Sequence, residues 1–350
     1  MKKYIYTAAF AILAIVSCAK DDTKDVNKGR KIDFRVATTR ATETTTDNLN
    51  EIWVTAIGEN GNAHFSKVQF TKENNYFVTP NAYYWPSDGS DLKFYAFAPS
   101  EELIGAEALT IDGTTQLIKG FTPASAIKDQ IDLIVADGTG NKDNSANGAE
   151  LVFDHALTQV EIRAYSNNTG YKHLVKGVRI GKVVSVGDLN LYDKTWDLGT
   201  EKSTYEITYD LPIELNAESQ SLMDSNVAGQ QINRNAMIIP QKLTPWDVEN
   251  DKDNTEDGSY LSVLINITTA DGAVVFPSTE GEYEWVAFPI SEELVRGFKY
   301  TFNMDFTNGS GYVDPTVPGT PGEEVLGGKI QFTHRISDWT SDFNIPDIEM

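Results

Sequence analysis

Apolar and polar residues alternate along most of the chain, in short runs that end at turn-forming residues. Alternation with a period of two buries one face of a strand, and many short strands with frequent turn signals are typical of a β-sandwich. We therefore predict an all-β protein in which helices are confined to short pieces. The clearest runs, rich in β-branched and aromatic residues, are 51–57, 92–97, 159–165, 205–209, 261–267, 285–288 and 300–306.

Two polar stretches divide the series of strands. The first, 138–148, consists mainly of glycine, asparagine, aspartate and serine, and we predict a domain boundary there. The resulting β-sandwich domains, 32–148 and 149–350, are of ordinary size. The second stretch, 308–328, is rich in glycine and proline. Because such long loops are unusual inside compact domains, it either closes a wide hairpin or lets the last strand, 329–336, move.

The N-terminus carries a predicted targeting signal. Lys2 and Lys3 precede an apolar stretch at 4–16, and Cys18, the only cysteine, follows it. A basic start and a short apolar core indicate a secretory signal peptide, since a spanning helix needs about 20 apolar residues. A cysteine at this place resembles the lipobox of bacterial lipoproteins. We predict that residues 1–17 are removed and that Cys18 is lipid-modified (palmitate); an ordinary signal peptide with a chance cysteine is the alternative.

The residues after Cys18 suggest where the protein is sent. Residues 18–31 are charged, without aromatic residues or periodicity, which predicts a flexible tether. Lys20-Asp21-Asp22 resembles the export signal that sends some Gram-negative lipoproteins to the cell surface. We therefore expect an outer-membrane, lipid-anchored protein displayed on the cell surface.

Charge and composition exclude several classes of function. The formal charge is −22, and removal of residues 1–17 takes away two lysines and gives −24. A chain this acidic repels nucleic acid and anionic lipid headgroups, so we expect no nucleic-acid partner. Neither a phosphate-binding loop nor a Gly-x-Ser-x-Gly nucleophile motif occurs, and the run 251–258 lacks the spacing of a calcium-binding EF-hand loop. Without such motifs we expect no enzyme activity and no cofactor. We also expect no metal, because the four histidines lack metal-ligand spacing: His64, His155, His173 and His334.

Several motifs, in order, resemble the fimbrillin-like (type V pilin) family of surface lipoproteins. They are Thr39-Arg40-Ala41-Thr42 after an opening strand, Tyr84-Trp85-Pro86 leading into 92–99, 153–160, Ile238-Ile239-Pro240-Gln241, and the late Trp339. The resemblance implies two transthyretin-like β-sandwich domains in tandem. It also implies a fimbrial subunit that serves adhesion: an arginine-directed surface protease removes the first strand, and the open groove receives a donor strand from another subunit.

The opening segment fits that scheme. Ile32, Phe34 and Val36 lie on one face of an extended segment, 32–37, and would be the removable groove fillers. The following segment, 37–47, has no apolar anchor, which is the kind of exposed segment that proteases cut. The candidate cleavage site is the bond between Arg40 and Ala41.

The donor strand is predicted near the C-terminus. The candidate residues form a first set, Ile330, Phe332 and Ile336, and a shorter second set, Phe343 and Ile345. The expected partners are other pilin subunits, the arginine-directed protease, the outer membrane through the lipid, and a host or bacterial surface ligand. The shaft, anchor and tip roles all stay open.

A surface glycan-binding lipoprotein is the competing class. Such proteins capture polysaccharide on exposed aromatic platforms. Trp246, between Pro245 and Asp247, is the best candidate for an exposed ring, whereas Trp53 and Trp285 lie in alternating strands and are expected in the core. Coplanar exposed aromatic side chains would favour glycan binding, and a buried, removable first strand would favour the pilin.

Overall fold

The computed structural model describes residues 31–38, 49–223, 226–227, 230–231 and 235–339. Regular structure within these ranges is almost entirely β-strand, with one short helix, α1 (Glu101–Ile104), and one 3-10 turn, η1 (Ile127–Asp129). The predicted all-β class is confirmed. The signal peptide, the tether and five predicted site residues lie outside the described residues: Cys18, Arg40, Ala41, Phe343 and Ile345.

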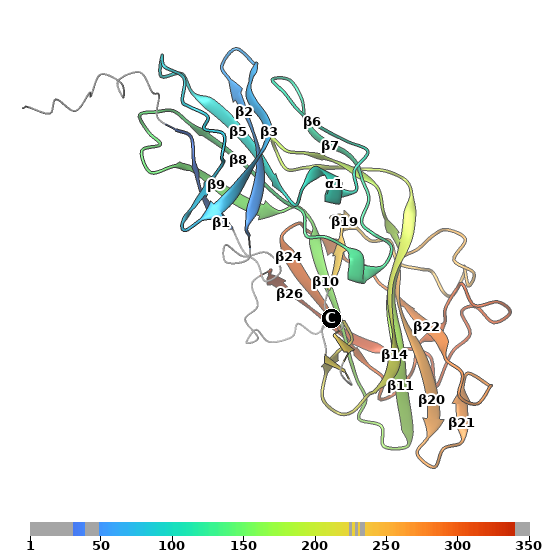
Figure 1. Cartoon of the computed structure of the whole chain (residues 1–350). Helices are drawn as coiled ribbons and strands as arrows, with labels where there is room; N and C mark the ends of the chain where they lie inside the picture. Colours follow the sequence, from blue (N-terminus) through green and yellow to red (C-terminus); the bar gives the residue numbers. More distant parts are fainter. Residues whose placement is uncertain (1–30, 39–48, 224–225, 228–229, 232–234, 340–350) are drawn as a thin grey trace, which may run out of the picture.

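The first part of the chain forms a sheet that closes on itself, drawn in blue to green in Figure 1. Its inward-facing residues alternate along each strand and form one aromatic-rich core. In spatial order the strands are β1 (Phe34–Thr38), β4 (Tyr76–Val78), β3 (Ala63–Glu73), β2 (Glu51–Gly58), β5 (Leu92–Ala98), β8 (Ile134–Gly140) and β9 (Ala149–His155), and β9 pairs again with β1.

The second part is a sandwich of two sheets around its own core. One sheet has the order β15 (Gln220–Ser221), β10 (Thr158–Tyr165), β24 (Phe298–Asp305) and β26 (Gln331–Asp338), with β18 (Ala236–Ile238) also paired to β10. The other has the order β14 (Lys202–Glu214), β11 (Tyr171–Val184), β20 (Tyr260–Thr269), β22 (Glu284–Pro289) and β25 (Tyr312–Val313), with β21 (Val274–Phe276) paired to β20.

Smaller elements complete the molecule. A fourth sheet has the order β13 (Trp196–Leu198), β12 (Gly187–Asn190), β7 (Gln116–Phe121) and β6 (Ala108–Ile111). Its apolar residues share a core cluster with β5 of the closed sheet and with Trp339, so packed side chains join the two parts. Two short pairs are β16 (Asn226–Val227) with β17 (Gln230–Gln231), and β19 (Gln241–Lys242) with β23 (Glu293–Leu294).

The predicted domain boundary at residue 148 falls between two strands of one sheet. Residues 138–140 of the polar stretch end β8, and 141–148 link it to β9; the two strands pair through Ile134 with His155 and Val135 with Asp154. By sheet membership, the first unit therefore runs to His155. That the two units are tandem domains stays a prediction.

The long glycine- and proline-rich segment 308–328 closes a wide hairpin. β24 and β26 are antiparallel neighbours from Phe298 opposite Asp338 to Asp305 opposite Gln331. Between them the chain crosses to the facing sheet, where β25 pairs with β22. The fully buried Asp314 anchors this crossing by an ion pair with Arg179 on β11, with 2.5 Å between Oδ1 and Nη2.

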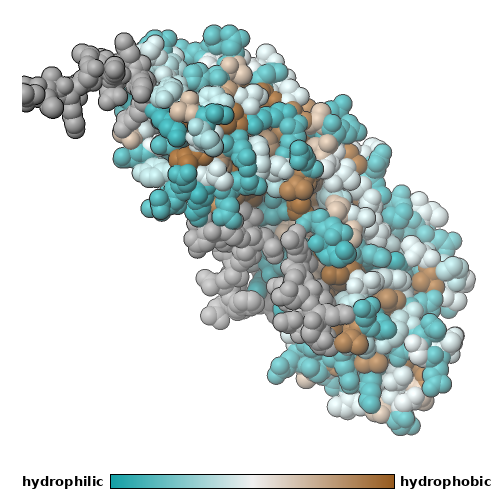
Figure 2. Space-filling model, viewed as in Figure 1, coloured by the Kyte–Doolittle hydropathy of each residue, from teal (hydrophilic) through white to brown (hydrophobic). Residues whose placement is uncertain are grey.

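Trp246, the best candidate for an exposed ring, is buried. Its ring is buried against Tyr260 and Tyr312, and its Nε1 donates a hydrogen bond to the Asp251 carbonyl at 2.7 Å. All six tryptophans lie in the described part and are buried or half-buried, Trp53 and Trp285 among the latter. Figure 2 shows a largely hydrophilic face with small, separate apolar patches. Tryptophan rings therefore form no exposed platform in the described residues.

Among the described residues, no helix has the length and the apolar character that crossing a membrane would require.

Candidate functional site

The candidate site is the place that β1 occupies in the closed sheet. Alternation orients the strand: Ile32 and Phe34 are fully buried and Val36 is half-buried against the same core, whereas Arg35 faces solvent. The observed strand, Phe34–Thr38, begins two residues later than predicted. Ile32 lies before it, and its backbone N–H donates a hydrogen bond to the Tyr83 carbonyl at 2.8 Å. The role of these residues as groove fillers stays a prediction.

Phe34 is the central contact of this strand. Its ring meets those of Phe70 and Phe94 edge-on, at centroid distances of 4.9 and 5.0 Å. Trp85 in turn packs edge-on against Phe94 at 5.7 Å. Buried aromatic rings dominate core energetics, and edge-to-face pairs add about 0.5–1.5 kcal/mol each beyond their buried area.

Backbone hydrogen bonding holds β1 on both sides. It runs parallel to β9, from Phe34 opposite Ala149 to Thr38 opposite Phe153, and meets β4 at Phe77. The amide of Ala149 also donates to the Asp33 carbonyl at 2.9 Å. β1 is therefore the strand that closes the sheet, and without it β4 and β9 would become sheet edges with unpaired donors and acceptors.

The turn into β9 approaches β1 closely at Gly148. This residue has a φ of +85°, and a Cβ atom there would lie 3.1 Å from Asp33 Oδ1. A glycine meets both demands, because it adopts positive φ without strain and has no side chain to collide.

Charge contributes little to holding β1. The ion pair between Arg35 and Glu150 spans 3.9 Å, and both side chains are about half or more exposed. Such surface pairs are worth about 0–1 kcal/mol. Apolar burial and the backbone ladder therefore carry the attachment of the strand.

The candidate cleavage site follows β1 directly. The described chain stops at Thr38 and resumes at Leu49, which is buried in the same core. Arg40 and Ala41 belong to the intervening residues, 39–48, which lie outside the described part. The backbone of β1 is therefore paired up to Thr38, opposite Phe153, and the chain is anchored again by Leu49 two residues before β2.

The first set of predicted donor residues lies in this molecule's own sandwich. β26 pairs with β24 along its whole length, and Ile330 and Phe332 pack against the core of the second part. Phe332 lies 6.5 Å from the Phe302 ring, whereas Ile336 is 39% exposed. The second set, Phe343 and Ile345, lies beyond the described residues.

Two features were not found from the sequence. His155 Nδ1 lies 2.8 Å from Asp132 Oδ1, and its ring stacks on Trp339 at 4.0 Å, where the closed sheet meets the sandwich. A cavity beside His173 is the second feature, and its walls come from segments far apart in the sequence. Within the described ranges, no group of three or more His, Cys, Asp or Glu side chains is placed to hold a metal ion.

Comparison with known proteins identifies relatives of one kind. The fimbrium subunit Fim1C of Phocaeicola vulgatus is 24% identical over 306 residues, covering 73% of this chain and 79% of that protein. The crystal structure of a fimbrial protein from Bacteroides vulgatus superposes with a TM-score of 0.55 at 16% identity, covering 88% of this chain and 99% of the other. Both relatives are described as fimbrial proteins. The family described as fimbrillin-like matches residues 39–339, which is most of the chain, and the protein therefore belongs to the fimbrillin-like family.

Proposed function

We propose that this protein is a structural subunit of a cell-surface fimbria that serves adhesion, and that it assembles by strand exchange after β1 is removed. One observation carries the proposal: β1 closes the sheet with the fully buried Ile32 and Phe34, and Arg40 follows it within a few residues. Membership of the fimbrillin-like family supports association with other pilin subunits.

Removing β1 leaves a groove that is suited to another strand. Loss of Ile32, Phe34 and Val36 uncovers apolar surface worth roughly 1.5–3 kcal/mol per fully buried side chain. The exposed edge of β9 offers backbone hydrogen bonds along the whole strand, from Ala149 to Phe153, and β4 adds a contact at Phe77. Strand addition satisfies both needs, because the incoming backbone restores the ladder while alternate side chains fill the pockets. The free energy lost with β1 is thus offset in the assembled subunit.

The donor is best supplied by the residues after β26. Donation of Ile330 and Phe332 would require β26 to leave its own sheet and to expose its own core. Phe343 and Ile345 lie farther along, two residues apart, as one face of a strand requires. Pro346 cannot donate a ladder hydrogen bond, so pairing would end near it.

Processing and location complete the proposal. Lipid attachment at Cys18 brings the chain to the outer membrane, and an arginine-directed protease at the surface cuts between Arg40 and Ala41. A subunit that keeps Cys18 within the fibre would act as the anchor.

The test is the mass and N-terminal sequence of subunits recovered from surface fibres of the native cells. The expected mature chain begins at Ala41, and Arg40→Ala stops both shortening and fibre growth. Arg35→Ala, which changes an exposed arginine on β1 itself, is the matched control and leaves both unchanged. Fibres whose subunits all begin at Cys18 would contradict the proposal.

A further inference from the structure

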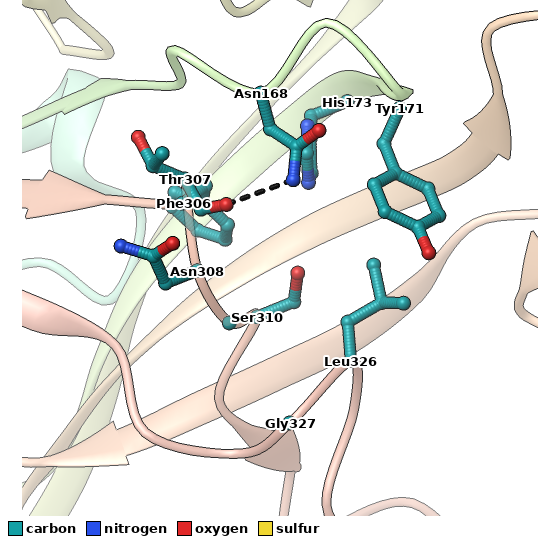
Figure 3. Close-up of a pocket in the computed structure, with 10 residues that line it drawn as sticks. Asn168, Tyr171, His173, Phe306, Thr307, Asn308, Ser310, Leu326 and Gly327 are labelled. Carbon is teal, nitrogen blue, oxygen red and sulfur yellow. Dashed lines mark hydrogen bonds between the residues drawn. The ribbon is translucent and has the colours of Figure 1, made fainter.

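A cavity of about 400 Å³ lies where β10 and β24 end and β11 begins. Because β10 starts next to the closed sheet, the cavity lies at the opposite end of that strand, away from the β1 site. A cavity of this volume is in the range of small-molecule sites. Its lining comes from three separate segments, 168–173, 306–310 and 326–327 (Figure 3).

Two buried polar side chains on its walls lack a partner. His173 is 1% exposed and Ser310 is 0% exposed. Neither ring nitrogen of His173, nor Ser310 Oγ, has a hydrogen-bond partner among the described residues. Figure 3 shows the Ser310 hydroxyl pointing into the space bounded by Asn168, Tyr171 and Leu326. Nearly all buried polar groups in folded proteins are hydrogen-bonded, to protein or to ordered water. Two unpartnered side chains that line one cavity are therefore places where water or a ligand can supply the missing hydrogen bonds.

The walls of the cavity are held in place independently of any ligand. Asn168 Nδ2 donates to the Thr307 carbonyl at 2.9 Å, and Asn168 Oδ1 accepts from the Gly170 amide at 2.9 Å. Leu326 has a φ of +44°, a left-handed conformation that bulky residues rarely adopt. Strained residues of this kind concentrate at ligand sites.

The lining defines the chemistry of the ligand. It carries no charged side chain, and the whole chain is strongly acidic, which disfavours an anion. Burial lowers the pKa of His173 to about 4, so at neutral pH its imidazole is uncharged and has one donor and one acceptor. A purely apolar ligand would leave His173 and Ser310 unpaired. An uncharged ligand with many hydroxyl groups and one apolar face fits all three features.

We propose that this cavity binds a neutral sugar residue of a surface glycan. His173 and Ser310 would hydrogen-bond its hydroxyl groups, and the half-buried ring of Tyr171 would pack against its apolar face. The proposal assigns a ligand class to the adhesion role, and in this respect it rests on the proposed function. It does not depend on strand exchange, because the cavity and β1 lie in different parts of the molecule.

The test is saturation-transfer NMR on the purified, unassembled full chain. The probes are glucose, galactose, mannose and N-acetylglucosamine, each at about 10 mM to reach millimolar dissociation constants, with N-acetylneuraminic acid as the charged comparator. At least one neutral sugar is expected to bind and to shift the His173 ring-nitrogen resonances. Using unassembled protein separates a failure of this site from a failure of fibre formation.

Variants locate the binding. Ser310→Ala removes only the unpaired hydroxyl, so the protein should fold normally and lose about 3- to 10-fold in affinity. Tyr171→Ala should weaken binding at least as much. The control is Tyr192→Ala, an exposed tyrosine beside a different cavity, which should leave affinity unchanged.

Three results would overturn the proposal. If none of the four neutral sugars binds, His173 and Ser310 are satisfied by water alone. Binding that Ser310→Ala and Tyr171→Ala leave unchanged would place the site elsewhere. Tighter binding of N-acetylneuraminic acid than of any neutral sugar would overturn the ligand class.

Discussion

Phe34 packs between Phe70 and Phe94 and has no exposed surface, so its loss should destabilise the closed sheet. We expect Phe34→Ala to lower the free energy of unfolding of the uncleaved chain by about 3–5 kcal/mol, because a large cavity replaces the ring. Guanidinium denaturation measures the change. Val152→Ala on the neighbouring β9, where the side chain is 38% exposed, should cost much less and serves as the control.

The same substitution separates precursor from fibre. If β1 leaves before assembly, subunits in fibres no longer contain residue 34. Fibre subunits made from the Phe34→Ala chain should then have the same free energy of unfolding as fibre subunits made from the wild-type chain. A penalty that persists in the fibre would mean that β1 stays.

His173 gives the sandwich a predictable response to acid. Burial lowers its pKa to about 4 in the folded chain, whereas an unfolded histidine titrates near 6.5. The unfolded state therefore binds the proton first as pH falls, and stability should decrease between about pH 6.5 and 4, by up to about 3 kcal/mol. His173→Phe should remove this pH-dependent loss. The free energy of unfolding of the variant should therefore rise relative to that of the wild type as pH falls from about 6.5 to 4. Parallel curves for the two proteins would refute the assignment.

At the scale of the elements, a buried ion pair ties the long segment between β24 and β26 to β11. Asp314 accepts hydrogen bonds from Ser262 and Thr316 in addition to its contact with Arg179. Asp314→Ala removes the buried carboxylate that pairs with Arg179 and leaves it only the Thr316 hydroxyl at 2.7 Å and the half-exposed Glu206 at 4.0 Å. Losing the buried partner of a buried charge should cost about 3–5 kcal/mol. We also expect residues 308–328 to become sensitive to proteolysis.

Denaturation measures the loss of stability in Asp314→Ala, and limited proteolysis measures the cleavage of residues 308–328. The control is Glu150→Ala, which breaks an exposed pair with Arg35 and should cost less than about 1 kcal/mol. Equal losses from the two variants would mean that the buried pair does not anchor the segment.

Local pattern was enough to locate the seven clearest runs, each of which falls on an observed strand, and to orient the first strand. Alternation in 32–37 places the same residues inward that the structure buries, because the two faces of a strand differ in every sequence window. Pairing partners were not predictable in this way. The parallel match of β1 to β9 joins residues more than a hundred positions apart, which no local pattern records.

Long-range folding also explains the errors. Trp246 has polar and breaker neighbours, yet the loop after it folds back, and its Asp251 carbonyl accepts the indole hydrogen bond. The predicted boundary at 148 followed a polar stretch, and in the structure residues 141–148 of that stretch connect two paired strands of one sheet, β8 and β9. The cavity beside His173 was not predicted because its three segments come together only in the folded chain.

At the scale of the whole molecule, the closed sheet and the sandwich share a packed junction at which the described chain ends. Trp339, fully buried and stacked on His155, follows the end of β26 directly. The proposed donor residues therefore start from a fixed point of the molecule, while the groove they would fill lies on a neighbouring subunit. In the assembly that we propose, fibre growth requires that β1 leave and that a donor strand enter.

Covalent locking of β1 tests this central claim most directly. Arg35 and Glu150 are cross-strand partners with exposed side chains, and neighbouring strands lie about 4.8 Å apart, within the reach of a disulfide. The double substitution Arg35→Cys and Glu150→Cys should let an arginine-specific protease cut at Arg40 while β1 stays attached. Each single substitution is a control and should assemble normally.

The measurement is fibre formation by the cut, oxidised double variant, followed by electron microscopy and intact mass. We predict no fibres until a reductant releases β1, and normal fibres afterwards. Fibres that grow from fully cross-linked, fully cut subunits would contradict the account, because β1 would then still occupy the groove.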